Sequence, residues 1–440
     1  MVLTVLAQSK ICFCHAKPIL RMSPEQCRKL RTAVTLSIGA LLFIYGTISY
    51  QLRWQLAHGY SDFVSFYTAG KILQGHQAFR LYDLGLQHQI QQEIYPNFAN
   101  RQGALPFVRP PFEAWLFLPL AHFSYPTAFV LWNLFSGTCL VAIVAILRRE
   151  LSELRRFSSF FLTCAMLSYF PVFLTILQGQ DSILLLLVYV LAYQKLRNKQ
   201  HLTAGMILGF GSLKFPLLVP FLIPLLIKSK YRLTLGFALT SILLCGLSVA
   251  TVGASTCLRY PAFLMGIDKL AKGVNVPGDM PNIRGLLSIV PVLKPFPTLS
   301  IVILCIISLL LVASVIQKSS FNPLTDRQLF NLSFSFNLVV TLLVSYHCHS
   351  FDLCLLLLPI ALVLELLFSD GAISSRFRNA LVLGLGLILF SPFYILLNFV
   401  VGSPALLAVI VLVFAGALHL ALSDAASSPP RTAIGNIPLF

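Results

Sequence analysis

The feature that most constrains the fold of this chain is a series of apolar runs, recurring along almost its whole length, that are long enough to cross a lipid bilayer. A spanning helix needs about 20 consecutive, mostly apolar residues. Hydrophobic residues make up 57% of the 440 positions and charged residues only 11%, which is typical of a protein buried in lipid rather than in a water-soluble globule. Because a bilayer offers the backbone no water, each run is expected to be an α-helix.

The apolar runs number roughly twelve by this criterion. They cover residues 33–50, 124–147, 157–177, 181–195, 202–213, 215–227, 234–253, 297–316, 329–346, 351–367, 379–400 and 404–422. The fifth and sixth runs, on either side of Lys214–Phe215–Pro216, are too short to span alone, which predicts a broken or re-entrant pair. We therefore expect an all-α polytopic membrane protein with about 10 to 12 transmembrane helices.

The chain divides into one large membrane domain and two short flanking segments. We expect residues 1–32 to form a partly disordered cytoplasmic segment, 33–422 a single membrane-embedded domain, and 423–440 a cytoplasmic tail. The first 21 residues lack the apolar core of a signal peptide. Met22 reads as an alternative start, so residues 1–21 are expected to contribute nothing to the fold.

Lysine and arginine residues, which give the chain a formal net charge of +17, lie in short clusters between the apolar runs. The clusters are Arg28, Lys29 and Arg31; Arg148, Arg149, Arg155 and Arg156; Lys195, Arg197 and Lys199; Lys228, Lys230 and Arg232; and Arg376 with Arg378. The positive-inside rule assigns such clusters to the cytoplasmic side. Both termini are then cytoplasmic, and no nucleic-acid partner is expected.

Polar residues without an anchoring role fall on the opposite, extracytoplasmic face. They come from the loop around Asp62, from Gln178–Gly179–Gln180–Asp181, from Lys214, from Asn282–Ile283–Arg284, and from Tyr346–His347–Cys348–His349–Ser350–Phe351–Asp352. Separated polar segments that converge on one side indicate an active site at the outer membrane surface.

Two outer loops frame this face. The first, about 51–123, is the largest hydrophilic piece, and its apolar residues from Phe63 to Leu73 recur at helical spacing. That spacing predicts an amphipathic helix lying along the membrane, with Asp62 near its N-terminus. The second loop, about 254–296, is expected to cover the site.

These segments resemble glycosyltransferase family 87 in their motifs and their order, over about residues 33–422. The motifs are Asp62–Phe63 with Tyr67–Thr68–Ala69–Gly70, Leu81–Tyr82–Asp83, Arg109–Pro110–Pro111, Gly179–Gln180–Asp181, Lys214–Phe215–Pro216, Met280–Pro281–Asn282–Ile283–Arg284, and Tyr346–His347 with Phe351–Asp352. The resemblance implies a C-type glycosyltransferase of the bacterial cytoplasmic membrane. Such an enzyme transfers a hexose, mannose being the best-known case, from a polyprenyl-phosphate sugar to a lipid or glycan acceptor with inversion at the anomeric carbon. It needs no cofactor.

Asp62 is the candidate general base. Glycosyl transfer needs a group within hydrogen-bond reach of the acceptor hydroxyl to take its proton, and a partly desolvated carboxylate at a helix start suits that role. The alternative is that Asp62 only caps the helix, which Asp does often. The resemblance favours catalysis.

Arg284, Lys214 and His347 are the candidate ligands of the donor phosphate, whose negative charge must be stabilised as the bond breaks. For Arg284 and Lys214 the alternative is that the side chains only extend their charged groups toward the lipid headgroups. If their segment is extended, His347 and His349 face the same side; if it is helical, only one of them faces the site.

Asp83, Gln180, His349 and Asp352 are the candidate sugar or acceptor ligands. Asp83 could instead mark a helix end, Gln180 could belong to an ordinary polar turn, and Asp352 could orient a histidine. Nothing in the sequence has the spacing of a metal site.

A transporter or flippase of a lipid-linked glycan is the main alternative from another class. Transporters place ionisable residues near the bilayer midplane and often pair broken helices in two repeats. Here only the Lys214 region looks broken and it has no twin, so the sequence favours the enzyme. A catalytically inactive scaffold is the third alternative.

Overall fold

The computed structural model describes residues 23–94, 103–228, 231–270, 276–293, 295–322, 327–369 and 375–427. All regular secondary structure in these ranges is helical. Eight of the described helices are long and apolar enough to cross a membrane, and the total rises to ten if each of two bent helix pairs counts as one span. The prediction of an all-α polytopic membrane protein is confirmed, although the eight to ten spans among the described residues reach only the lower limit of the predicted 10 to 12.

The helices of the membrane domain follow the predicted apolar runs closely. The long ones are α2 (Pro24–Gln51), α7 (Tyr125–Glu150), α13 (Tyr231–Val252), α16 (Pro297–Lys318), α17 (Arg327–Val344) and α21 (Leu407–Ser427). The bent pairs are α8 (Ser159–Leu167) with α9 (Phe170–Gln178), at 74°, and the segments Phe377–Leu389 and Ser391–Val400, at 50°. Shorter members are α10 (Ser182–Arg197), α11 (His201–Gly209), α12 (Phe215–Lys228), α18 (Leu357–Phe368), α19 (Ser375–Leu389) and α20 (Ser391–Ile395).

The first and last described helices are longer than the apolar runs from which they were predicted. Helix α2 begins at Pro24 rather than at residue 33. The Ser23 hydroxyl oxygen accepts a bond from the backbone N–H of Gln26, and Gln26 Oε1 accepts a bond from the backbone N–H of Ser23. This reciprocal cap starts the helix ahead of the basic cluster. At the other end α21 runs to Ser427. The expectations for residues 1–21 and for the end of the tail lie outside the described residues.

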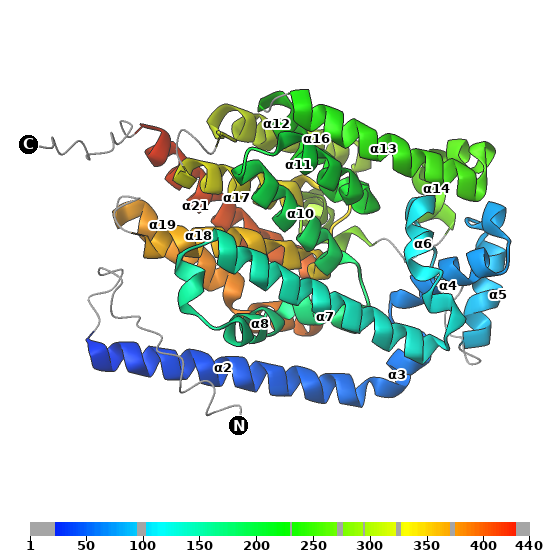
Figure 1. Cartoon of the computed structure of the whole chain (residues 1–440), viewed down its shortest axis with the longest axis horizontal. Helices are drawn as coiled ribbons and strands as arrows, with labels where there is room; N and C mark the ends of the chain where they lie inside the picture. Colours follow the sequence, from blue (N-terminus) through cyan, green and yellow to red (C-terminus); the bar gives the residue numbers. More distant parts are fainter. Residues whose placement is uncertain are drawn as a thin grey trace, which may run out of the picture.

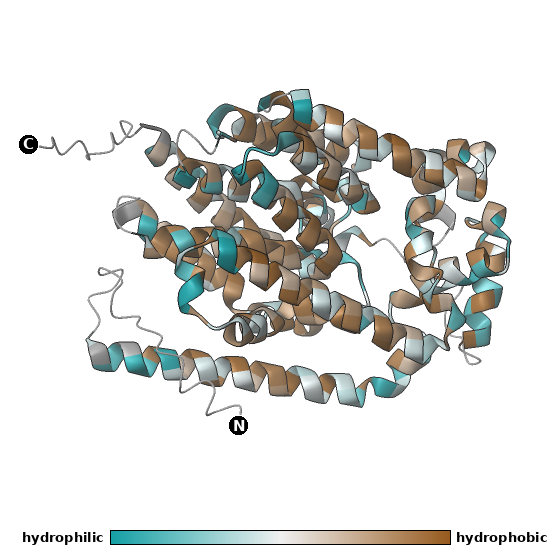
Figure 2. Cartoon of the chain, viewed as in Figure 1, coloured by the Kyte–Doolittle hydropathy of each residue, from teal (hydrophilic) through white to brown (hydrophobic). Residues whose placement is uncertain are grey.

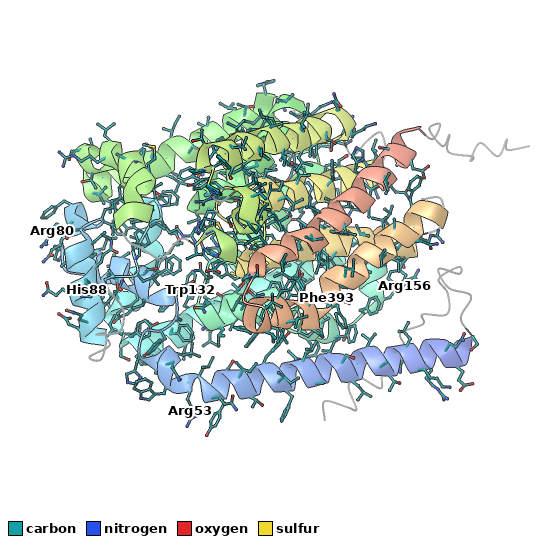
Figure 3. All side chains as sticks on the ribbon, turned by 180° about the vertical axis from the view of Figure 1, so that it is seen from behind. Arg53, Arg80, His88, Trp132, Arg156 and Phe393 are labelled. Carbon is teal, nitrogen blue, oxygen red and sulfur yellow. The ribbon has the colours of Figure 1, made fainter. Side chains whose placement is uncertain are left out.

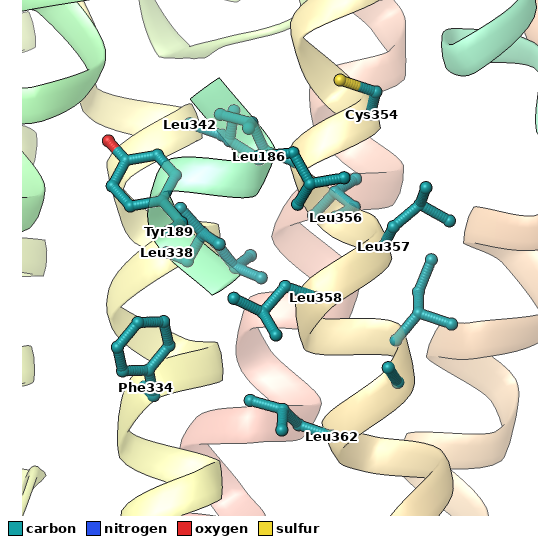
Figure 4. Close-up of a cluster of buried hydrophobic side chains, with 14 of the residues drawn as sticks. Leu186, Tyr189, Phe334, Leu338, Leu342, Cys354, Leu356, Leu357, Leu358 and Leu362 are labelled. Atoms are coloured by element: carbon teal, nitrogen blue, oxygen red, sulfur yellow. The ribbon is translucent and has the colours of Figure 1, made fainter. Parts of the chain in front are cut away.

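The core of the bundle is built from α10, α17 and α18, which other helices surround. Figure 4 shows Leu186 and Tyr189 facing Phe334 and Leu338, and all four side chains are almost completely buried. Hydrophobic residues dominate the bundle, whereas hydrophilic ones gather at the ends of its helices (Figure 2). Helix α2, by contrast, lies along one side of the bundle and buries almost none of its surface (Figure 1), as expected of a helix that faces lipid.

The broken pair predicted around Lys214 is a reversal of the chain. Helices α11 and α13 run parallel in contact, since Gly205 lies against Leu233 and Gly209 against Thr240. The chain between two parallel neighbours must turn back, so α12 returns toward the end where α11 began. The turn is the 3₁₀ segment Phe210–Lys214. Although the whole stretch 201–228 is long enough to span, its two halves run in opposite directions and bring Lys214 to the tip of a helical hairpin.

The segment predicted to be the first outer loop folds into a small helical cap at one end of the bundle, with α14 (Ala254–Leu270) beside it (Figure 1). The cap contains α3 (Arg53–Ala57), α4 (Phe63–Gln74), α5 (Leu84–Ile94) and α6 (Ala114–Phe117). Figure 3 shows Arg80 and His88 of this cap at the opposite end of the molecule from Arg156 of the basic loop, as the predicted sidedness requires.

Helix α4 corrects one expectation. Its predicted position is right, but almost all of its residues from Phe63 to Leu73 are buried within the protein. Phe63 packs against Phe129 and Trp132 of α7, and a Cβ on Gly70 would meet the carbonyl oxygen of Phe117 at 2.5 Å. The helix is therefore an internal element of the cap and does not lie on a lipid surface.

Because α11 packs closely on α13, we expect one added methyl group at their contact to destabilise the protein. A Cβ on Gly236 would lie 2.0 Å from the carbonyl oxygen of Leu202, so we expect Gly236→Ala to lower the free energy of unfolding by about 1–3 kcal/mol. Thermal unfolding of the purified protein in detergent measures this. Gly246→Ala is the control, because no atom lies within 4 Å of the Cβ at that position of the same helix. Equal stability of the two variants would contradict the described packing.

Candidate active site

A cavity of about 270 Å³ lies where the cap meets the bundle. Its polar lining comes from five separate stretches of the chain and includes Asp62, Ser65, Arg109, Gln180, Lys214, His347 and His349. Three further lining residues, Tyr260, Leu264 and Ile267, belong to α14, so the segment predicted to be the second outer loop covers part of the site. The structure thus brings together most of the polar segments that the sequence placed on one face.

Asp62 is held at the cavity by the packing of its neighbour. Phe63 is fully buried, and this anchors the first turn of α4. Asp62 occupies the N-cap position, but its side chain accepts no capping hydrogen bond from the helix. Instead its Oδ2 accepts a bond of 2.8 Å from Gln180 Nε2, and its backbone N–H donates to Gln178 Oε1 at 3.2 Å. The capping alternative is therefore wrong for the carboxylate.

Gly179 makes this contact between α4 and α9 possible. It ends α9 with a φ of 61°, a left-handed conformation that glycine adopts without steric cost. A Cβ there would lie 2.7 Å from Cβ of Phe63. The Gly179 carbonyl also accepts a bond from Trp132 Nε1 at 2.9 Å. The turn that carries Gln180 is thus fixed against the start of α4.

Lys214 lies at the centre of a buried ionic network. Its ammonium group contacts Asp181 Oδ1 at 2.8 Å, Asp352 Oδ1 at 2.5 Å and Ser182 Oγ at 2.7 Å. An ammonium has three N–H donors, and these three acceptors occupy all of them. Lys214 was predicted to bind the donor phosphate; the structure shows it pairing the two carboxylates instead, so a phosphate would have to displace one of them.

Asp352 holds the histidine segment in place. Its Oδ1 also accepts from Ser182 Oγ at 2.6 Å, and its Oδ2 accepts the backbone N–H of His349 at 3.0 Å. This bond caps the start of the 3₁₀ helix Ser350–Leu356. The Asp352 side chain is almost fully buried. Of the two roles considered for Asp352, orienting a histidine is the one that its contacts fit.

Arg109 is a cation of the site that our list of candidate residues missed. Its Nη2 lies 2.9 Å from Asp181 Oδ1 and 3.4 Å from Gln180 Oε1, and its Nη1 donates to the carbonyl of Leu213 at 3.4 Å. A guanidinium has five N–H donors, so these bonds leave donors for a ligand in the cavity. The sequence held one signal for it, the Arg–Pro–Pro motif, which we took only as part of the family resemblance.

The backbone around Arg109 is held from both sides of the cavity. Tyr82 Oη donates to the carbonyl of Arg109 at 2.7 Å, and Tyr260 Oη donates to the carbonyl of Val108 at 2.9 Å. Tyr82 and Tyr260 also stack, with ring centroids 5.1 Å apart. The cap and α14 therefore fix the backbone that carries Arg109.

His347 and His349 both line the cavity, as an extended segment predicts. Their rings pack edge to face with centroids 4.6 Å apart. Burial lowers the pKa of His347 well below its usual value, and the neighbouring His349 lowers it further. Burial also lowers the pKa of His349. Both imidazoles are therefore neutral near pH 7 and available as hydrogen-bonding groups.

Arg284 and Asp83 do not line this cavity. The guanidinium of Arg284 stacks on the Tyr346 ring at 3.8 Å and donates to the Tyr346 carbonyl at 3.0 Å, so it supports the rim. Asp83 pairs with Arg80 at 2.7 Å and accepts backbone N–H groups at the start of α5. The pairing with Arg80 lowers the pKa of Asp83. The helix-end alternative fits these contacts of Asp83.

A family model described as glycosyltransferase family 87 matches residues 107–345, which is more than half of the chain. The chain belongs to glycosyltransferase family 87. It is therefore a membrane glycosyltransferase, and the transporter and scaffold alternatives are set aside. No curated protein and no solved structure matches this glycosyltransferase in the comparisons.

The matched range contains only part of the site. Arg109, Gln180, Asp181 and Lys214 fall within it, whereas Asp62 and the histidine segment lie outside. The family match thus supports the enzyme class, and the role of Asp62 depends on the geometry. Among the described residues no group of three or more His, Cys, Asp or Glu side chains is arranged to hold a metal ion.

Gly179 gives the site its most direct structural test. We expect Gly179→Ala to lower the free energy of unfolding by about 2 kcal/mol through backbone strain and to lower glycosyl transfer about 100-fold by displacing Gln180 from Asp62. Gly402→Ala is the control, since Gly402 has a φ of 64° with no atom within 4 Å of its Cβ. That variant should lose stability but keep its transfer rate. Unchanged transfer in Gly179→Ala would contradict the positioning role.

Proposed function

We propose that this glycosyltransferase moves a hexose from a polyprenyl-phosphate sugar to an acceptor hydroxyl at the extracytoplasmic face of a bacterial cytoplasmic membrane. The observation that carries the proposal is the link from Asp62 through Gln180 to Arg109. One amide donates to the carboxylate at 2.8 Å and accepts from the guanidinium at 3.4 Å. The Gln180 side chain thereby bridges the proposed base, Asp62, and the proposed anion-binding cation, Arg109.

In the proposed reaction the acceptor oxygen attacks the anomeric carbon from the face opposite the phosphate. The bond between that carbon and the phosphate oxygen breaks, and the polyprenyl phosphate leaves with the bonding electrons. Asp62 takes the proton of the acceptor hydroxyl. Gln180 occupies Asp62 Oδ2, so Oδ1 is the oxygen proposed to accept this proton. Attack opposite to the leaving group inverts the anomeric carbon.

The leaving phosphate gains negative charge, and the cavity offers three groups for it. Arg109 has N–H donors left over from its contacts with Asp181, Gln180 and Leu213. Its planar fork suits phosphate oxygens. His347 and His349 also line the cavity, as neutral hydrogen-bonding groups. Stabilising charge that develops during the reaction is the largest catalytic contribution in many enzymes.

The acceptor and the lipid tail occupy the less polar part of the cavity in this proposal. Leu264 and Ile267 on α14, together with Phe215 and Pro216 at the tip of the α11–α12 hairpin, supply an apolar wall. A polyprenyl chain needs such a surface beside a polar site for its phosphate. The acceptor is a lipid or a glycan, and mannose is the hexose that the family resemblance favours.

Asp62→Asn tests the proposed base. We expect it to lower transfer from a synthetic polyprenyl-phosphate sugar by about 10²–10⁴-fold, the usual contribution of a general base, with membrane expression and thermal stability unchanged. Asp83→Asn is the matched control: it makes the same substitution in the same loop, but outside the cavity lining, and should keep most of the activity. Full turnover by Asp62→Asn would remove Asp62 from the mechanism.

Thiol labelling tests the proposed orientation. Arg80 and Arg156 are both exposed and lie at opposite ends of the molecule (Figure 3). We expect cysteine placed at position 80 to react with a membrane-impermeant reagent in intact cells, and cysteine at position 156 to react only after the membrane is opened. The parent chain, which keeps its native cysteines, sets the background. The reverse pattern would overturn the assignment of the cavity to the outer face.

A further inference from the structure

Glu113 is a fully buried acid that the proposed mechanism does not use. It ends the 3₁₀ turn Pro111–Glu113, four residues after Arg109, and its side chain has no solvent exposure. Neither of its carboxyl oxygens has a hydrogen-bond donor within reach. A buried acceptor without a donor costs free energy, and a buried ionised one costs considerably more.

The charges around Glu113 do not balance if every acid is ionised. Arg109 and Lys214 supply two positive charges, whereas Asp181, Asp352 and Glu113 supply three carboxyl groups. All five groups are buried almost completely, with Arg109 the most exposed at 14% of its side chain. One carboxyl group of the three must carry a proton for this cluster to be neutral.

The hydrogen bonds identify which acid holds that proton. Both oxygens of Asp352 accept bonds, from Lys214 and Ser182 on one side and from the His349 backbone on the other. Asp181 Oδ1 accepts from both cations. Only Asp181 Oδ2 and the two oxygens of Glu113 lack a donor, and the two carboxyl groups lie within hydrogen-bond reach of each other. A proton on Glu113 supplies the missing donor for Asp181.

We propose that Glu113 is a positioning residue that stays protonated at neutral pH and donates a hydrogen bond to Asp181, which leaves Arg109 free to bind the donor phosphate. The part that concerns Arg109 rests on the proposed function. An ionised Glu113 would compete with the incoming phosphate for the guanidinium. The protonated acid leaves Asp181 as the single carboxylate partner of Arg109 and fixes it from its other oxygen.

Other groups that face Glu113 fit this assignment. Burial raises the pKa of Glu113 well above its usual value; Arg109 and Lys214 oppose the shift and Asp181 adds to it. Tyr82 and Tyr260 also lie near Glu113, but their hydroxyl groups donate to the backbone on either side of Arg109. They therefore supply no donor to Glu113.

Infrared spectroscopy of the purified full-length protein tests whether Glu113 is protonated, without any assay of activity. A protonated carboxyl group has a C=O stretching band that a carboxylate lacks. We expect the wild-type protein at pH 7 to show a band of this kind that disappears in Glu113→Gln. Glu93→Gln, which removes an exposed carboxylate from the same cap, should leave the band in place. A spectrum in which Glu113→Gln removes no such band would overturn the proposal.

The stability of the protein gives a second readout with a definite sign. The folded protein holds the Glu113 proton more tightly than the unfolded chain, so folding is progressively destabilised as the pH rises from the ordinary Glu range through the raised pKa. Glu113→Gln removes this titration. The melting temperature of Glu113→Gln relative to wild type should therefore increase from pH 6 to pH 9, by a few degrees. A difference that is independent of pH would overturn the proposal.

Kinetics test the connection to Arg109. If ionised Glu113 competes for the guanidinium, the wild-type KM for the polyprenyl-phosphate sugar rises with pH on the alkaline side, while that of Glu113→Gln stays flat and kcat changes less in both. Glu113→Leu should raise this KM about tenfold or more, the scale of one hydrogen bond to a charged group, and Glu113→Gln should recover most of that loss. If the wild type transfers sugar but its KM changes with pH in the same way as that of Glu113→Gln, the positioning role is overturned. Absence of any transfer by the wild type would instead refute the proposed function and leave the infrared result standing.

Discussion

The ionic contact of Lys214 with Asp181 and Asp352 holds the polar part of the site together. It joins the tip of the α11–α12 hairpin, the start of α10 and the 3₁₀ helix after the histidines. Removing one partner of a buried pair leaves an uncompensated charge and costs about 3–5 kcal/mol. Because Asp181 also holds Arg109 and Asp352 also holds the His349 backbone, one ammonium group sets the positions of groups on both sides of the cavity.

Much of this arrangement could be predicted from the sequence, because two simple constraints act on it. The length of an apolar run fixes a helix, and the basic clusters fix which ends lie together. Those constraints were enough to place Asp62, Gln180, His347 and His349 on one face, and these residues share a cavity. They also located the interruption of the helix at Lys214. They did not show that its ammonium group pairs with two carboxylates.

What could not be predicted depends on partners that are distant in the chain. Arg109 and Glu113 were missed because a short Arg–Pro–Pro stretch looks the same whether its side chains reach water or a buried carboxylate. Arg284 was expected in the site by motif, but its guanidinium stacks on Tyr346 at the rim. The spacing of α4 predicts an apolar face, and only the tertiary packing shows that protein covers its other faces too. Pairing and burial of charges are tertiary properties, which a local pattern does not encode.

A structure of the protein with a non-hydrolysable polyprenyl-phosphate sugar bound would locate the phosphate and the anomeric carbon relative to Arg109 and Asp62. We expect the phosphate to lie in the cavity within hydrogen-bond distance of Arg109 and the histidine pair, with the anomeric carbon facing Asp62 and the Lys214 contacts intact. A phosphate bound to Arg284 at the rim, or one that takes Lys214 from its carboxylates while Asp62 points away from the sugar, would contradict this expectation.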